Sequence, residues 1–195
     1  MPMLENLIQL IVLFTVIIDP LASFAVFTVA TDPMKRSERR KTAMLAILVA
    51  AVLSGLVLFL GERLLDLFNT DIESFKVAGG IILLIFGIQM SLGLSLFDVE
   101  KKEGNSSAAI ASLIATPLLT GPATISTIII ASHDYGVTDT GLAIAIVLGL
   151  SAVLLFLSAD ISKKIGKIPI QVLSTIMGLI TLAWGIMFIR EGLGF

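Results

Sequence analysis

The sequence has 195 residues, of which 56% are hydrophobic and 14% charged, with a net charge of −2. A soluble domain carries about 25% charged residues, so this composition excludes an ordinary soluble domain and is typical of an integral membrane protein. The near-neutral charge gives no basis for binding nucleic acid, and the absence of cysteine excludes disulfides and thiol chemistry.

Six apolar segments bounded by charged residues are predicted to cross the bilayer, because a spanning helix needs about 20 mostly apolar residues. They are residues 4–29, 42–60, 74–96, 108–131, 141–160 and 171–189. Little of the chain remains for loops, so we expect one all-α transmembrane domain over residues 1–195, with the lipid bilayer as its surroundings.

Basic residues predict the orientation of this domain. Ten of the thirteen Lys and Arg residues lie in the loops after the first, third and fifth spans. Since cytoplasmic loops are enriched in Lys and Arg, these three loops are predicted to face the cytoplasm and both termini to lie outside a cell membrane.

The first span contains Asp19 followed by Pro20 deep within its apolar run. Asp is a good helix N-cap and Pro is favoured at the first helical position, so a helix is predicted to start there, inside the membrane. Thr15, Asp19 and Ser23 share one helical face. Asp19 either contacts a substrate or ion, as acidic residues inside membranes commonly do, or only caps the helix that follows.

The third span is rich in glycine, including Gly80 and Gly87, and the sixth contains Gly178 and Gly185. These glycines predict close packing of helices. Gln89 is a polar residue in the third span and a weaker candidate for the substrate pathway.

The fourth span carries Thr116-Pro117 and, one turn later, Gly121-Pro122, which predict a second interruption. Thr120 lies between them. The hydroxyl groups of Thr116 and Thr120 either contact a ligand or form hydrogen bonds between helices, whereas packing is the better interpretation for Thr124. His133 and Asp134, beyond this span, are interpreted as residues of a solvated loop rather than metal ligands.

An internal repeat relates the two halves of the chain. The matches are Asp19-Pro20-Leu21 with Thr116-Pro117-Leu118 and residues 53–60 with 150–157 at an offset of 97, and residues 80–88 with 178–186 at an offset of 98. Apolar sequences resemble one another by composition, but composition does not explain why Pro and paired Gly residues keep their register over three spans. Because each repeat has three spans, residues 1–97 and 98–195 are predicted to be inverted relative to each other, with a site near the midplane.

These residues resemble the MarC family, usually grouped with the LysE-type exporters. The resemblance rests on Asp19-Pro20, on the run Thr116-Pro117-Leu118-Leu119-Thr120-Gly121-Pro122, and on the two glycine-ended segments Gly80–Gly87 and Gly178–Gly185. Many members continue the first motif as D-P-x-G-N-x-P, where this chain has Ala22, Ser23 and Ala25. The resemblance implies proton- or sodium-coupled transport of small neutral amino acids, of glycine or alanine size.

The expected function is therefore a secondary transporter that alternates access around a site between spans one and four. The predicted substrate-binding residues are Asp19, Pro20, Ser23, Gln89, Thr116, Pro117, Thr120, Gly121 and Pro122. No ATP-binding motif is present, so the energy for transport is expected to come from an ion gradient or from the concentration gradient of the substrate itself. A channel, a non-transporting scaffold and an exporter of other small metabolites are the alternatives. An enzyme is not expected, because the spans offer Asp19 no catalytic partner, and neither a metal nor an organic cofactor is expected.

Overall fold

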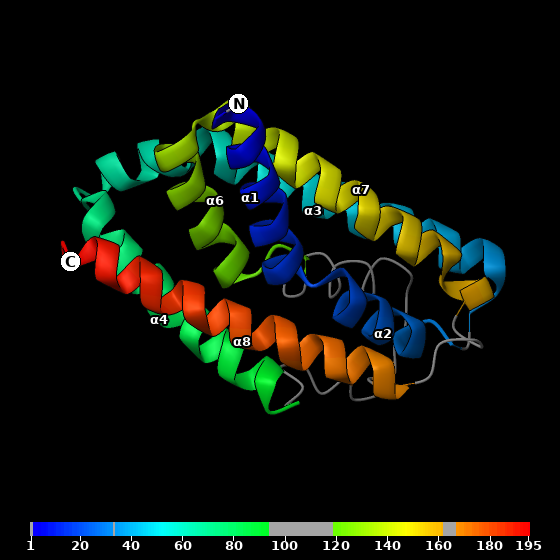
Figure 1. Ribbon diagram of the computed structural model, residues 1–195. Coiled ribbons are helices and arrows are strands. Elements are labelled where there is room, and N and C mark those ends of the chain that lie inside the picture. Colours follow the sequence, from blue (N-terminus) through cyan, green and yellow to red (C-terminus); the bar gives the residue numbers. More distant parts are fainter. Residues whose placement is uncertain (1, 33, 94–118, 162–166) are drawn as a thin grey trace.

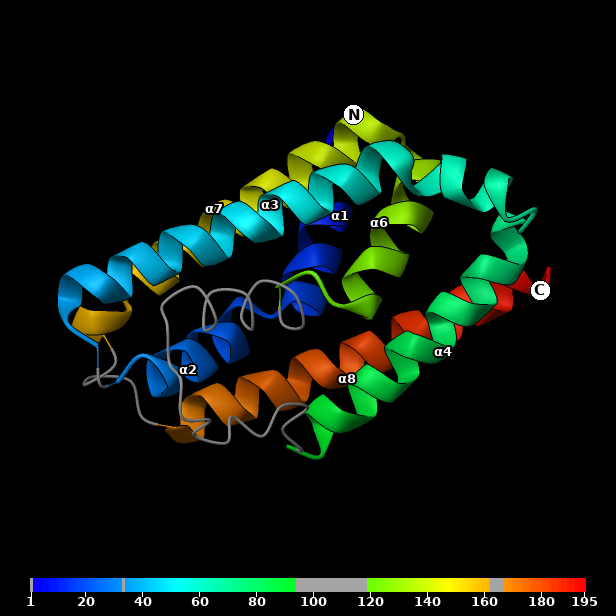
Figure 2. The ribbon, with the colours of Figure 1, turned by 180° about the vertical axis from the view of Figure 1, so that it is seen from behind.

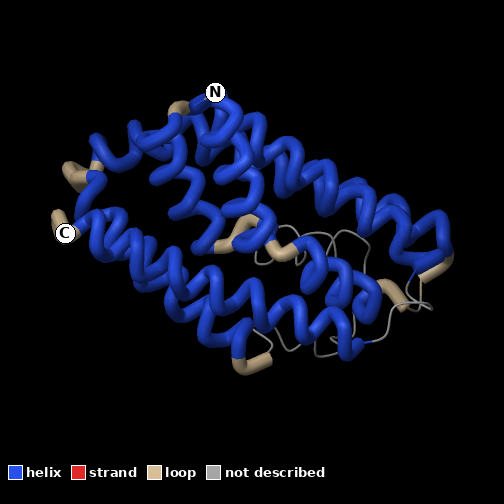
Figure 3. Tube along the Cα trace, viewed as in Figure 1, coloured by secondary structure: helices blue, strands red, loops and turns tan. Residues whose placement is uncertain are grey.

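The computed structural model describes residues 2–32, 34–93, 119–161 and 167–195, and within these ranges the chain forms helices and short connections without strands (Figures 1 and 3). The helices are α1 (Pro2–Ile18), α2 (Pro20–Ala30), α3 (Arg36–Leu67), α4 (Ile72–Ser91), α6 (Pro122–Tyr135), α7 (Val137–Ile161) and α8 (Lys167–Gly192).

Five helical segments are long and apolar enough to cross a membrane. They are Leu4–Ala30, which comprises most of α1 with α2, then Arg36–Leu67, Ile72–Ser91, Val137–Ser158 and Val172–Gly192. Five of the six predicted spans are thus found as helices. Of the predicted fourth span, α6 represents the second part, while residues 108–118 lie outside the described residues.

The ends of the helices differ from the predicted spans because hydropathy detects only their apolar part. The second span, predicted over 42–60, belongs to the longer helix α3, which continues through charged turns at both ends. Its start is stabilised by Glu38, whose carboxylate accepts a hydrogen bond of 3.2 Å from the backbone N–H of Lys35. α4 begins after Asp71, which accepts hydrogen bonds from the backbone N–H and the hydroxyl of Ser74. These hydrogen bonds hold the pKa of Asp71 below its usual range.

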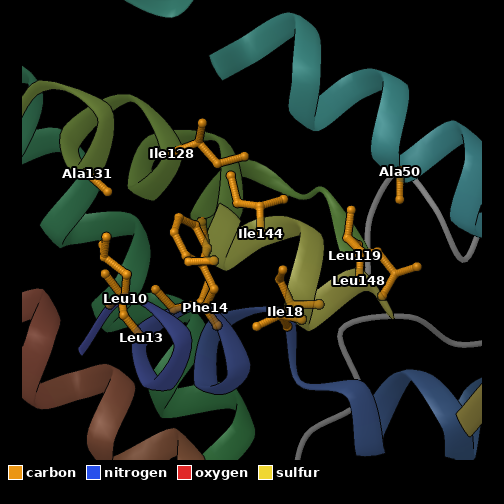
Figure 4. Close-up of a cluster of buried hydrophobic side chains, with 14 of the residues drawn as sticks. Leu10, Leu13, Phe14, Ile18, Ala50, Leu119, Ile128, Ala131, Ile144 and Leu148 are labelled. Carbon is orange, nitrogen blue, oxygen red and sulfur yellow. The ribbon is translucent and has the colours of Figure 1, made fainter. Parts of the chain in front are cut away.

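The helices form three layers (Figures 1 and 2). α3 and α7 lie side by side in one outer layer, and α4 and α8 in the other. Between them lie α1, α2 and α6. α2 packs on α7 and α8, whereas α6 packs on α3, α4 and α7. Side chains of α1, α3, α6 and α7 meet in a buried apolar cluster that includes Phe14, Ala50, Ile128 and Leu148 (Figure 4).

α3 has large apolar side chains on its outer face and small residues on its inner face, as a helix in a membrane does. Large apolar side chains repeat every four residues on its exposed face, at Met44, Leu48, Val52 and Leu56. Small residues occupy the face that packs inside, at Ala43, Ala46, Ala50 and Ser54. Small inward residues allow close helix packing, and a large apolar outer face suits lipid, so this pattern supports a membrane environment.

α4 and α8 run antiparallel and approach closely at paired glycines. A Cβ atom at Gly80 would lie 2.6 Å from the carbonyl oxygen of Gly185, and one at Gly87 would lie 2.8 Å from that of Gly178. Side chains at these positions would overlap the neighbouring backbone. The predicted role of these glycines in close packing is confirmed.

Candidate functional site

The first helix interruption is centred on Asp19, between α1 and α2. Asp19 has a left-handed backbone conformation with φ 41° and ψ 74°. Its N–H still donates to the carbonyl of Thr15 at 3.2 Å, so the last turn of α1 is complete. Pro20 has no N–H, and the carbonyl of Val16 therefore loses the donor that a continuous helix would supply.

Side chains replace the backbone hydrogen bonds that this interruption removes. In a continuous helix the N–H of Ala22 would donate to the carbonyl of Ile18. Here it donates to the Asp19 carboxylate at 3.1 Å, and the hydroxyl of Ser23 donates to the Ile18 carbonyl at 3.4 Å. Asp19 is therefore the N-cap of α2, with Pro20 in its first position.

The Asp19 carboxylate also contacts the second half of the chain. Its side chain is buried, and its second oxygen accepts a hydrogen bond of 3.2 Å from the hydroxyl of Ser174 on α8. Ser174 could not be predicted from the sequence, because a contact across 155 positions leaves no local pattern. A carboxylate has about four lone-pair positions, so Asp19 retains capacity to accept further donors.

A second group of polar atoms surrounds Thr120, just before α6. Thr120 is buried, and its hydroxyl lies 3.3 Å from the carbonyl oxygen of Ala50, to which it donates, and 3.4 Å from the hydroxyl of Ser54. Gly121 is extended and precedes Pro122, the first residue of α6, without a side-chain hydrogen bond to cap the helix. Thr116 and Pro117 lie outside the described residues.

These two polar regions lie beside each other at the centre of the molecule. In both ribbon views, the C-terminal end of α1 and the segment that leads into α6 lie side by side (Figures 1 and 2). Their neighbours Ile18 and Leu119 belong to the same buried cluster, and Figure 4 shows both in that cluster. The structure thus brings Asp19, Pro20 and Ser23 into the same region as Thr120 and Gly121.

The other predicted polar residues have different surroundings. Gln89 is half-buried near the end of α4, and its amide oxygen has no hydrogen-bond partner among the described residues. No hydrogen bond joins it to Asp19 or Thr120. Pro122 is exposed, unlike Pro20, which is buried. On α6, the hydroxyls of Ser126 and Thr127 donate to carbonyls of their own helix, so they serve the helix backbone.

The arrangement combines a buried carboxylate, several hydroxyl groups and a helix N-terminus in one apolar environment. Such groups can hold a small polar ligand by hydrogen bonds and charge. In the part of the chain that the structure describes, no group of three or more His, Cys, Asp or Glu residues could hold a metal ion.

Comparison with known proteins identifies the family. A family model described as "MarC family integral membrane protein" matches residues 4–194. The chain is 31% identical over 188 residues to a UPF0056 membrane protein of Methanocaldococcus jannaschii, with 91% of this chain and 90% of the relative covered. It is 32% identical over 189 residues to the UPF0056 membrane protein YvbG of Bacillus subtilis, covering 90% and 88%. The corresponding protein YhcE of Escherichia coli is 30% identical over 186 residues, covering 91% and 86%. No solved structure matches the chain. Full-length similarity to these membrane proteins and the match to the family model agree with the helical fold, and the chain belongs to the MarC family of integral membrane proteins.

Proposed function

We propose that this protein is a secondary transporter of small neutral amino acids, which alternates access around a site near the membrane midplane. The observation that carries the proposal is the buried Asp19 at the interruption between α1 and α2, inside the apolar segment Leu4–Ala30. An acidic group inside a span is costly, by about 2.5–3.5 kcal/mol on insertion scales, and usually belongs to a substrate or ion pathway.

The chemistry of the two polar regions suits a zwitterion. The remaining acceptor positions of Asp19 suit an ammonium group. The N-terminus of α6, where Gly121 supplies no side-chain cap, suits a carboxylate, because helix N-termini attract anions. Ser23, Thr120 and the predicted members Thr116, Pro117 and Gln89 complete the proposed site. Glycine- or alanine-sized substrates are proposed, as the family resemblance implies, and a proton or a sodium ion is the proposed coupling ion.

The helix contacts support two inverted repeats as the basis of the transport cycle. Gly80 corresponds to Gly178 and Gly87 to Gly185 in the sequence repeat. In the structure, Gly80 lies against Gly185, and Gly87 lies against Gly178. Exchanging the two repeats converts the first pair into the second. The same exchange relates the packing of α2 on α7 and α8 to the packing of α6 on α3 and α4. Repeats that rock against each other around a central site are a recurrent transporter design.

A counterflow experiment tests this proposal. The protein is reconstituted into liposomes loaded with unlabelled alanine, and uptake of labelled alanine is measured. A carrier is expected to take up label faster when unlabelled substrate is present inside, whereas a channel or a scaffold is not. The proposal would be contradicted if the rate of uptake were the same with and without internal substrate for alanine, glycine and serine.

The variant Asp19→Asn tests the role of the buried carboxylate. Losing a hydrogen bond to a charged group costs about 1.5–3 kcal/mol, so exchange is expected to require about 10- to 150-fold more substrate. The matched control is Asp66→Asn, which changes an exposed aspartate of α3 and is expected to leave exchange unaltered. Unchanged exchange by Asp19→Asn would remove this residue from the mechanism.

A further inference from the structure

A group of charged side chains joins α4, α6 and α8 where α4 begins and where α6 and α8 end. The Lys76 ammonium nitrogen lies 2.7 Å from a carboxylate oxygen of Asp134 and 3.1 Å from one of Glu191. The Lys76 side chain is only 14% exposed. The other Asp134 oxygen lies 3.0 Å from Nδ1 of His133. Asp134 is exposed, as the sequence predicts, but it lies in the last turn of α6 rather than in a loop, and it is ion-paired.

About one helical turn after Lys76, α4 is in close contact with α6. A Cβ atom at Gly79 would lie 3.1 Å from both the Ser126 Cβ and the Ile130 Cδ1 of α6. Ser126 and Ile130 are buried, so the two helices leave no open passage between them here. Access from this end between α4 and α6 therefore requires that the helices separate and that the contact between Lys76 and Asp134 breaks.

The internal repeat gives Lys76 a counterpart. At the offset of 98 that matches Gly80 with Gly178, Lys76 corresponds to Ser174. Ser174 extends from the second half of the chain to Asp19 in the first half, and Lys76 extends from the first half to Asp134 in the second. Corresponding positions of α4 and α8 thus each form polar contacts with the opposite half of the chain.

We propose that Lys76 is the latch of a gate, which closes the substrate pathway between α4 and α6 at the end of the protein where α8 terminates. The meaning of the gate for transport rests on the proposed function. In the closed state, one ammonium group bridges carboxylates of two helices. Removing it leaves Asp134 and Glu191 close together without a cation, which favours separation of α6 from α4.

A thiol-labelling experiment tests the gate in the full-length protein. Because the natural chain has no cysteine, Ser126→Cys introduces one reporter at the contact with Gly79. The protein is placed in lipid nanodiscs, so that a membrane-impermeant methanethiosulfonate reaches both faces and the result does not depend on orientation. The labelling rate is measured with Lys76→Met or Asp134→Asn in the same chain. The matched control is Arg63→Met, which removes an exposed cation near the end of α3.

With the gate variants, labelling is expected to be about tenfold faster than in the parent, which corresponds to about 1.4 kcal/mol in the opening equilibrium. Arg63→Met is expected to label at the parent rate. The double variant Lys76→Asp with Asp134→Lys again places one cation between two carboxylates and is expected to restore slow labelling. If both Lys76→Met and Asp134→Asn label at the rate of the Arg63→Met control, or if the double variant labels as fast as Lys76→Met, the gate is contradicted. Labelling reports opening without transport, so a protein that fails the counterflow test while showing this pattern has the gate but not the proposed function.

Discussion

Asp19 combines three features that rarely occur together in one residue. It is buried, acidic and in a left-handed conformation inside an apolar span. Asp tolerates that conformation better than most residues, yet such backbone strain costs about 1–3 kcal/mol and is concentrated at functional sites. A cap alone could be supplied by Ser or Thr, which are neutral and therefore less costly to bury. The proposed contact with a ligand or an ion would give a reason for a carboxylate at this position in addition to capping.

Ser174 is expected to be a positioning residue for the Asp19 carboxylate. In Ser174→Ala, the carboxylate loses a donor, and a typical hydrogen bond contributes about 1 kcal/mol, so the substrate concentration for half-maximal counterflow is expected to rise about fivefold. Ser174→Thr keeps the hydroxyl and is expected to restore most of the affinity. Thr181→Val is the control on the same helix, because that hydroxyl donates to the carbonyl of Met177 in its own helix. Equal affinities for Ser174→Ala and Thr181→Val would show that the contact with Asp19 has no role in binding.

At the scale of the elements, the pair α4 and α8 is the most tightly connected unit of the structure. Glycines meet the opposite backbone at two levels of this antiparallel pair. Because contacts at two levels oppose sliding, we expect this pair to move as one rigid body. Movement is then expected between this pair and the helices α1, α2 and α6, which contact it through fewer residues.

The glycine contacts predict a difference in stability between two alanine substitutions. Gly87→Ala places a Cβ 2.8 Å from the Gly178 carbonyl oxygen, and such overpacking is expected to cost about 1–3 kcal/mol. Gly149→Ala, in α7, meets nothing within 4 Å and is expected to leave stability unchanged or to raise it by about 0.5–1 kcal/mol, because alanine favours helix. Thermal unfolding in detergent measures both. A Gly87→Ala protein that melts no lower than Gly149→Ala would contradict the close contact.

At the scale of the whole molecule, two outer layers enclose α1, α2 and α6 (Figure 1). Among the described helices, α2 packs on α7 and α8, and α6 packs on α3 and α4 but also on α7. The orientation of the protein in the membrane is predicted from the uneven distribution of Lys and Arg over the loops.

Cysteine labelling of intact cells tests this orientation. Ser37 and Thr70 are exposed and lie near opposite ends of α3. With an impermeant maleimide, Thr70→Cys is expected to react in intact cells, and Ser37→Cys only after the membrane is permeabilised. The reverse pattern would invert the predicted orientation, and reaction of both in intact cells would mean that α3 does not cross the membrane.

The sequence by itself determined the membrane-spanning character, most of the spans, and the helix start at Asp19 and Pro20. These follow from properties of single segments, namely apolar length, the missing N–H of proline and the capping preference of aspartate. It also identified Gly80, Gly87, Gly178 and Gly185 as packing positions, because small residues allow close approach wherever the partner lies.

Only the tertiary structure decided which helices are neighbours, and with them the polar contacts between distant segments. Ser174 donates to Asp19 across 155 positions, and Lys76 binds Glu191 across 115. The sequence correctly predicted that Asp134 is exposed, but it could not predict the cation that α4 brings to it. Helical periodicity specifies which side of a helix is polar, but the partner of that side depends on how several helices pack together, and this packing is a property of the whole chain.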